Sequence, residues 1–125
     1  MNADWVRNYF KTVDTLDAEA IATHFTDDGK FRFSNQPAVI GRQAVRDALA
    51  QFFEIIKEMH HEITGLWFGE DGNSAVCEAD VTYTRKNGTQ VTLPCASILR
   101  SHNDQIYDFR INMDISPVYA DHEPE

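Results

Sequence analysis

Four polar residues alternate along the last apolar-rich stretch of the chain, where together they could perform acid–base chemistry. Residues 106–115 read Ile-Tyr-Asp-Phe-Arg-Ile-Asn-Met-Asp-Ile. Alternate side chains of a strand point to opposite faces, so this pattern predicts a strand with one polar face. That face carries Asp108, Arg110, Asn112 and Asp114. Two carboxylates, a guanidinium and an amide can hold a proton, fix its donor and stabilise a developing charge. The simpler alternative is an amphipathic strand whose polar face meets water.

A second stretch with the same alternation carries two more carboxylates. In residues 74–86, small and apolar side chains share one face, while Glu78 and Asp80 share the other with Val76. The following stretch, residues 89–101, has apolar residues on both faces. This predicts a sheet that is covered on both sides, by helices on one and by a second subunit on the other. Carboxylates on a covered face would need partners and would have shifted pKa values.

Length and charge exclude several classes of protein. The 125 residues suffice for one domain with one core, expected to span 1–125. A formal net charge of −9 disfavours binding to nucleic acid or to an anionic membrane. No apolar run approaches the roughly 20 residues of a membrane span, and the N-terminus does not resemble a signal peptide. We therefore expect a cytoplasmic protein.

Cysteine and histidine give no sign of a metal site. Cys77 and Cys95 lie far apart in strand-like runs, which favours reduced, buried thiols. His60 and His61 are adjacent, so in a strand they face opposite sides. Neither has an acidic partner at the spacing of a metal ligand set. The sequence predicts neither a metal nor a cofactor.

The periodicity of the chain predicts helices first and strands afterwards. Apolar residues follow helical spacing in 5–13, again after a capping Asp17, and from Arg42 to about Met59. A short strand is expected at Phe31–Phe33, and Asn87-Gly88 is a strong hairpin signal. The remaining strands are expected at 60–68, 74–86, 89–101 and 105–115, with a frayed tail at 117–125. This order predicts an α+β fold with one bent, mostly antiparallel sheet closed by helices on one side.

Several short motifs, in this order, resemble the NTF2-like superfamily. They read Asp17-Ala-Glu-Ala-Ile, Phe25-Thr-Asp-Asp, Gly41-Arg-Gln-Ala-Val-Arg, His61-Glu-Ile, Tyr83-Thr-Arg-Lys-Asn-Gly and Arg110-Ile-Asn-Met-Asp-Ile-Ser-Pro. Residues 5–118 are most similar to the SnoaL-like polyketide cyclase and ketosteroid-isomerase-like branch. The resemblance implies a cone-shaped sheet closed by three N-terminal helices around an apolar pocket, with homodimers formed through the outer sheet face. It also implies that Glu78, Asp80, Arg110, Asn112 and Asp114 point inward.

The resemblance assigns roles to individual residues. Asp114 falls where SnoaL-like cyclases have an aspartate that abstracts a proton next to a carbonyl. Asn112, Tyr9 or a protonated Asp80 would then lie near the enolate oxygen, while Arg110 keeps one carboxylate ionised. Tyr9 matches the tyrosine with which ketosteroid isomerases stabilise a dienolate. The position of the isomerase base falls at or near Phe33, which departs from that pattern.

Epoxide hydrolysis is a lesser alternative. Asp80 and Asp114 match acids of the limonene-epoxide-hydrolase-like enzymes, yet Glu78 stands where their Asp-Arg-Asp triad has its arginine. A carboxylate cannot donate the hydrogen bonds that this arginine supplies.

The expected function is therefore cofactor-free proton abstraction that isomerises or cyclises an apolar carbonyl compound. A non-catalytic module that binds a hydrophobic ligand or mediates dimerisation stays open, and a cavity too small for a ligand would favour dimerisation. The residues expected to line the pocket are Glu78, Trp5, Phe33, Phe52, Leu93 and Cys95.

Overall fold

One curled sheet forms the body of the molecule, and the α+β fold expected from the sequence is confirmed. The structure is a computed structural model that describes residues 1–120. Its six strands follow the order β2-β1-β6-β5-β4-β3, and only β1 and β6 run parallel. Their bounds are β1 (Phe25–Phe33), β2 (Val39–Ile40), β3 (Ile56–Phe68), β4 (Ser74–Arg85), β5 (Gln90–His102) and β6 (Gln105–Asn112).

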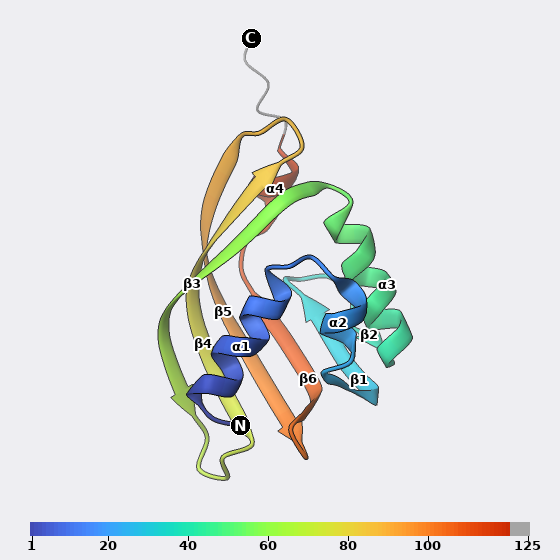
Figure 1. The fold of residues 1–125 in the computed structure, drawn as a ribbon, viewed down its shortest axis with the longest axis vertical. Coiled ribbons are helices and arrows are strands. Elements are labelled where there is room, and N and C mark those ends of the chain that lie inside the picture. Colours follow the sequence, from blue (N-terminus) through green and yellow to red (C-terminus); the bar gives the residue numbers. More distant parts are fainter. Residues whose placement is uncertain (121–125) are drawn as a thin grey trace.

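The N-terminal helices pack on one side of this sheet (Figure 1). The helices are α1 (Ala3–Val13), α2 (Ala18–Ala22), α3 (Arg42–Phe53) and a short α4 (Ser116–Tyr119). Polar side chains fix where the first two begin. The Asn2 carboxamide accepts a hydrogen bond from the Trp5 backbone N–H at 2.8 Å, and the Asp17 carboxylate caps α2 in the same way. No helix within residues 1–120 has both the length and the apolar character to cross a membrane.

The strands from β3 to β6 form the expected antiparallel meander. Pairing of β4 with β5 continues without a shift from Ser74 opposite Arg100 to Thr84 opposite Gln90. Gly88 closes this hairpin with a φ of 88°, a conformation that glycine adopts without a steric penalty. The hairpin predicted from Asn87-Gly88 is thus confirmed.

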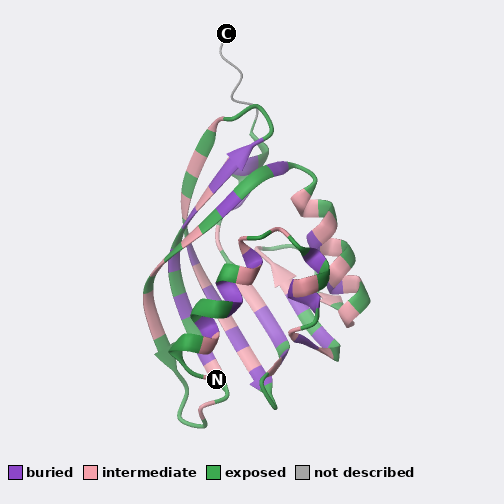
Figure 2. Cartoon of the chain, viewed as in Figure 1, coloured by how far each residue is buried: buried purple, intermediate pink, exposed green. Residues whose placement is uncertain are grey.

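Burial alternates along β4 and shows which face of the sheet meets the helices (Figure 2). The side chains of Ala75, Cys77, Ala79, Val81 and Tyr83 are buried on the inner face. They join a core with Val6, Tyr9 and Phe10 of α1 and with Val45 and Leu49 of α3. Val76, Glu78 and Asp80 are exposed on the outer face.

The third helix is shorter than its apolar pattern predicts. It ends at Phe53, and β3 begins at Ile56, so the expectation of a helix to Met59 is wrong. The pairing of β3 with β4 shifts register between Ile56 and Glu58. This irregularity buries both Ile56 and Met59 on one side at a spacing of three, which imitates the stripe of a helix.

Two other boundaries also differ from the expectation. The first strand is longer than the expected Phe31–Phe33, because β1 begins at Phe25, and its pairing with β6 shifts register between Phe25 and Lys30. At the other end, residues 116–119 form α4 instead of a frayed tail. Val118 is buried, and the Arg85 guanidinium donates a hydrogen bond to the Pro117 carbonyl at 2.7 Å. Residues 121–125 of the predicted tail lie outside the described residues.

Candidate functional site

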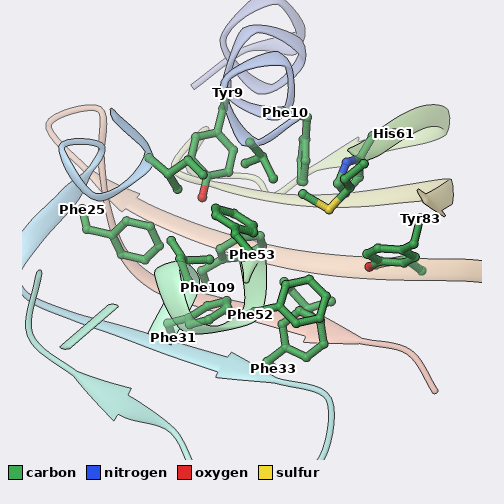
Figure 3. A pocket seen from close by; sticks show the side chains of 16 residues that line it. Tyr9, Phe10, Phe25, Phe31, Phe33, Phe52, Phe53, His61, Tyr83 and Phe109 are labelled. Carbon is green, nitrogen blue, oxygen red and sulfur yellow. The ribbon is translucent and has the colours of Figure 1, made fainter. Parts of the chain in front are cut away.

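A small cavity lies between the inner sheet face and the helices (Figure 3). Its volume is about 30 Å³, enough for one or two water molecules. The wall is almost entirely apolar and draws on helices and strands that are distant in sequence. Its aromatic members are Tyr9, Phe10, Phe25, Phe31, Phe33, Phe52, Phe53, Tyr83 and Phe109, with His61 beside them.

Tyr9 places an unpaired hydroxyl in this apolar space. Helix α1 presents the ring, Trp5 stacks on it at 5.6 Å and Phe109 meets it edge-on at 5.7 Å. Its oxygen points into the cavity, is buried, and has no hydrogen-bond partner among the described residues (Figure 3). Burial raises the pKa of Tyr9 far above its ordinary value of 10.0, so the hydroxyl keeps its proton. An unsatisfied buried hydroxyl costs about 1–3 kcal/mol. The site therefore favours an oxygen acceptor inside the cavity.

His61 lines the same cavity and is held by a carboxylate. Asp14 follows the last residue of α1, and its Oδ1 lies 2.6 Å from His61 Nδ1. The Asp14 Oδ2 accepts a second hydrogen bond, at 2.9 Å, from the His61 backbone N–H. Because Nδ1 faces a carboxylate, we assign a ring proton to Nδ1, so Nε2 is the nitrogen that could exchange a proton with a bound molecule. The ring packs on Phe10 at 4.9 Å, and the side chain is only 9% exposed.

The other titratable groups of the wall are neutral. Burial raises the pKa of Tyr83 well above its usual range, and its hydroxyl donates to the Met113 sulfur at 3.5 Å. Burial also raises the pKa of the Cys95 thiol, which lies 3.6 Å from the Ser97 hydroxyl. Cys77, behind the wall, has its pKa raised to about 11 by the same cause. These thiols are protonated and poorly nucleophilic at neutral pH.

The residues that sequence patterns placed at the pocket separate into two groups. Tyr9, Phe33, Phe52 and Cys95 lie in the wall of the cavity. Trp5 does not line it but stacks behind Tyr9, and Leu93 is half-buried further along β5 towards the hairpin.

The polar side chains of β4, of the end of β6 and of Asp114 face away from the cavity. Glu78, Asp80, Asn112 and Asp114 are exposed and border one shallow groove on the outer sheet face. Their expected inward orientation is therefore corrected. The opposite face of the same strands is apolar, and its burial against the helices stabilises the fold, whereas burial of carboxylates would cost free energy. A catalytic role for these side chains stays a prediction, and from the outer face they do not reach a molecule inside the cavity.

Asp114 and Arg110 each have a partner on this outer side. Hydrogen bonding from the Ser116 side chain, and then from the Ser116 backbone N–H at 3.0 Å, lowers the pKa of Asp114 and favours its charged form. Asp114 therefore has a structural contact of its own, in which its carboxylate holds the backbone two residues further along. Arg110 lies 3.2 Å from the buried Asp108, which also faces Arg100 at 3.6 Å. Arg110 thus neutralises Asp108 rather than Asp80 or Asp114.

The Asp14–His61 pair had no local signal in the sequence. The two residues are 47 positions apart, and the sequence singled out His61 as part of a family motif and as an unsuitable metal ligand, not as a partner of Asp14. An aspartate just after the first helix and a histidine at the inner side of a strand meet only once α1 lies across β3. Within residues 1–120, the structure brings together no cluster of three or more histidine, cysteine or acidic side chains that could hold a metal ion.

With this geometry in place, comparison with known proteins identifies the family. The sequence pattern of the SnoaL-like domain matches residues 6–109. The chain belongs to the SnoaL-like domain family. No curated protein sequence matches it.

Solved structures in the NTF2-like and ketosteroid-isomerase-like groups share the fold of this SnoaL-like domain. A Catenulispora acidiphila protein of ketosteroid isomerase-like fold, in complex with trimethylamine, has a TM-score of 0.82 at 21% identity, covering 94% of this chain and 91% of its own. SalBIII, an epoxide hydrolase/cyclase-like enzyme of pyran ring formation in salinomycin, has a TM-score of 0.78 at 22% identity, covering 90% of each chain. TerC co-crystallised with polyporic acid has a TM-score of 0.78 at 13% identity, covering 93% of each chain. At these identities the likeness shows the fold alone.

Proposed function

We propose that this SnoaL-like domain binds an apolar carbonyl compound in its inner cavity and moves a proton at the carbon beside the carbonyl, leading to isomerisation or cyclisation. One observation carries the proposal. A buried, unpaired Tyr9 hydroxyl and a His61 ring held by Asp14 face the same apolar cavity. Proton transfer of this kind needs no redox or group-carrying cofactor.

In this mechanism His61 is the general base and Tyr9 stabilises the developing oxyanion. His61 Nε2 takes the proton from the substrate carbon, and Asp14 stabilises the imidazolium that forms. The neutral Tyr9 hydroxyl donates a hydrogen bond to the enolate oxygen. The enolate then either regains a proton at another carbon or attacks an electrophilic carbon of the same molecule. The apolar wall excludes water, which strengthens both electrostatic interactions.

This mechanism moves the base from Asp114 to His61. Tyr9 keeps the role that the sequence predicts for it. Asp114 as the base, with Asp80 and Asn112 assisting, is the rival hypothesis, and it requires the substrate to bind in the outer groove. Water meets that groove freely and screens its charges, which weakens acid–base catalysis there.

Two alternatives differ in class. Epoxide hydrolysis is suggested by the likeness to SalBIII. Among the described residues, the wall of the cavity contains no acid–arginine–acid arrangement, because Glu78 and Asp80 lie outside it. The second alternative is a module without chemistry that binds a hydrophobic ligand or mediates dimerisation, and the small volume of the inner cavity favours its dimerisation version. The activity experiment below separates this second alternative from the enzyme.

The outer sheet face is the proposed homodimer interface. It exposes Trp67 at 56% and Val76 at 38%, which pair with each other across β3 and β4, and Ile98 pairs with Val76 from β5. Contiguous exposed apolar groups of this kind are typical of subunit contacts. We also propose that residues 1–125 act as one cytoplasmic domain, and the net charge of −9 still disfavours nucleic acid as a partner.

The experiment follows deuterium uptake at the carbon beside the carbonyl of 2-tetralone, a neutral bicyclic ketone, by NMR in D₂O. We expect the protein to accelerate exchange over buffer. His61→Gln should lower the accelerated rate by about 10²–10⁴-fold because the base is lost. Tyr9→Phe should lower it by about 10²–10³-fold because one oxyanion donor is lost. The matched control is His102→Gln, since His102 is an exposed histidine at the end of β5.

The outcomes separate the hypotheses. Exchange at the wild-type rate in His61→Gln contradicts the proposed mechanism. Loss of exchange in Asp114→Asn, with His61→Gln unaffected, returns the base to Asp114. A wild-type protein that binds the ketone without accelerating exchange is the non-catalytic module.

A further inference from the structure

A second, larger hollow adjoins the inner cavity near the C-terminal end of α3. We call it the vestibule, and it holds about 410 Å³. The vestibule and the inner cavity have four wall residues in common, which are Phe31, Phe33, Leu49 and Phe52. Side chains of these residues therefore separate one compartment from the other.

The sizes of the two compartments show that the inner cavity alone does not accommodate an organic substrate. Its volume is about 30 Å³, whereas a protein cavity that binds benzene measures about 150 Å³. Sites for small organic ligands usually measure about 300–1,000 Å³. The vestibule reaches that range. A ligand that contacts Tyr9 must therefore extend across the dividing wall.

Phe52 is the part of this wall best placed to move. It lies in the last turn of α3 and is only half-buried, so its ring can change rotamer without a shift of the sheet. The ring packs against Phe33 at 5.1 Å on the cavity side and against Tyr119 of α4 at 6.4 Å on the vestibule side. It also meets Tyr83 at 6.0 Å. Figure 3 shows Phe52 and Phe33 together at one end of the cavity.

The lining of the vestibule indicates what kind of molecule it takes. Among the described residues, no charged side chain lines it, and its polar side chains are the amides of Gln36 and Gln51 and the phenol of Tyr119. Tyr119 is 54% exposed and presents its ring beside Phe52. Such a wall binds apolar rings by stacking and accepts neutral hydrogen-bonding groups, while a charged group would lose its hydration without a partner.

We propose that Phe52 gates the inner cavity and that the ligand spans both compartments, as a neutral compound of at least two rings. One ring passes Phe52 and lies beside Tyr9. The other lies in the vestibule against Tyr119, with neutral polar groups towards Gln36 and Gln51. That the inner ring carries the carbonyl group rests on the proposed function, whereas the gate and the two-compartment site do not rest on it.

The test is stopped-flow fluorescence with N-phenyl-1-naphthylamine, a neutral probe with two linked ring systems. Phe52→Ala should raise the association rate about tenfold, equivalent to about 1.4 kcal/mol of barrier, because the ring no longer has to move. Phe52→Leu should also raise the association rate, but by less than tenfold. This variant tests the gate if Phe52→Ala fails to fold. Tyr119→Ala should weaken affinity about tenfold by removing the outer stacking surface.

Two controls locate the probe. Phe68→Ala removes a partly exposed phenylalanine at the end of β3, outside the walls of both compartments, and should leave the association rate unchanged. Trp67→Ala should leave binding intact, and loss of binding in this variant would place the probe on the outer face and overturn the proposal. Wild-type association rates in folded Phe52→Ala or Phe52→Leu would overturn the gate even if the exchange chemistry holds. Faster association in these variants together with failed exchange would support the gate and contradict the proposed function alone.

Discussion

The two faces of β4 carry opposite chemistry within one strand. The inner face consists of buried small and apolar side chains with Tyr83, and the outer face carries Glu78 and Asp80 in contact with water. The outer face has more ionisable groups, yet solvent screens them. The inner side offers few polar groups, but the Tyr9 hydroxyl has no partner and the His61 ring has a fixed orientation. Reactive potential thus follows burial and preorganisation rather than the number of polar residues.

The two faces should differ most in how much free energy of unfolding the protein loses when an aromatic side chain is removed. Phe109 of the inner face is 3% exposed and contacts Tyr9, Phe10, Phe25 and Phe31, whereas Trp67 of the outer face is 56% exposed. Phe109→Ala should lower the free energy of unfolding by about 3–5 kcal/mol because it leaves a cavity in the core. Trp67→Ala should lower it by about 1 kcal/mol or less, because more than half of the Trp67 side chain already meets water. Urea unfolding of both variants measures the difference, and equal losses would show that the outer face is covered in solution.

A smaller effect should appear at alkaline pH. The folded protein keeps the Tyr9 proton because burial raises the pKa of Tyr9, whereas the unfolded chain loses it above its ordinary pKa of 10.0. The folded state then binds more protons, so the free energy of unfolding falls as pH rises, by up to about 1.4 kcal/mol per pH unit from this group. Tyr9→Phe should remove that part of the slope and should not destabilise the protein at neutral pH, since it deletes an unpaired buried hydroxyl.

Urea unfolding at neutral pH and above pH 10 measures this slope. Tyr107→Phe is the matched control, because the hydroxyl of this exposed tyrosine meets water in the folded and the unfolded protein alike. A slope that Tyr9→Phe leaves unchanged would contradict the burial of the Tyr9 hydroxyl.

The smallest effect is expected from the outer carboxylates. Asp80→Asn should change the free energy of unfolding by no more than about 0.5 kcal/mol, because its side chain is exposed. Asp114 has a lowered pKa, so its small contribution is present at neutral pH and is lost as pH falls through the acid range. In Asp114→Asn the free energy of unfolding should therefore fall slightly less between neutral and acid pH than in the wild-type protein. Thermal unfolding from neutral to acid pH checks both variants, and a large loss at neutral pH would contradict the exposure of this face.

Strong local signals predicted much of the fold. The alternation of residues 74–86 and the Asn87-Gly88 turn fix β4 and its hairpin, because strand period and turn geometry are local properties. The same reasoning failed at Ile56 and Met59, where an irregularity in β3 reproduced helical spacing. It also gave no sign of α4, which is stabilised by the distant Arg85 and by burial of Val118.

The candidate site was predictable only in part. Tyr9, Phe33, Phe52 and Cys95 belong to apolar stripes, and such stripes identify residues that face the core. The Asp14–His61 pair depends on how α1 crosses β3, a contact between residues 47 positions apart. No pattern within either segment encodes that distance.

The sequence by itself determined which side chains share a face, because alternation is a property of the backbone. It therefore grouped Glu78 with Asp80 and Asn112 with Asp114, and the structure keeps these groups together in the outer groove. Only the tertiary structure decided which face encloses the cavity. The helices cover the apolar face, since burial of apolar surface is favourable and burial of several carboxylates is not. That choice left the acidic array in water and placed Tyr9 and His61 in the cavity.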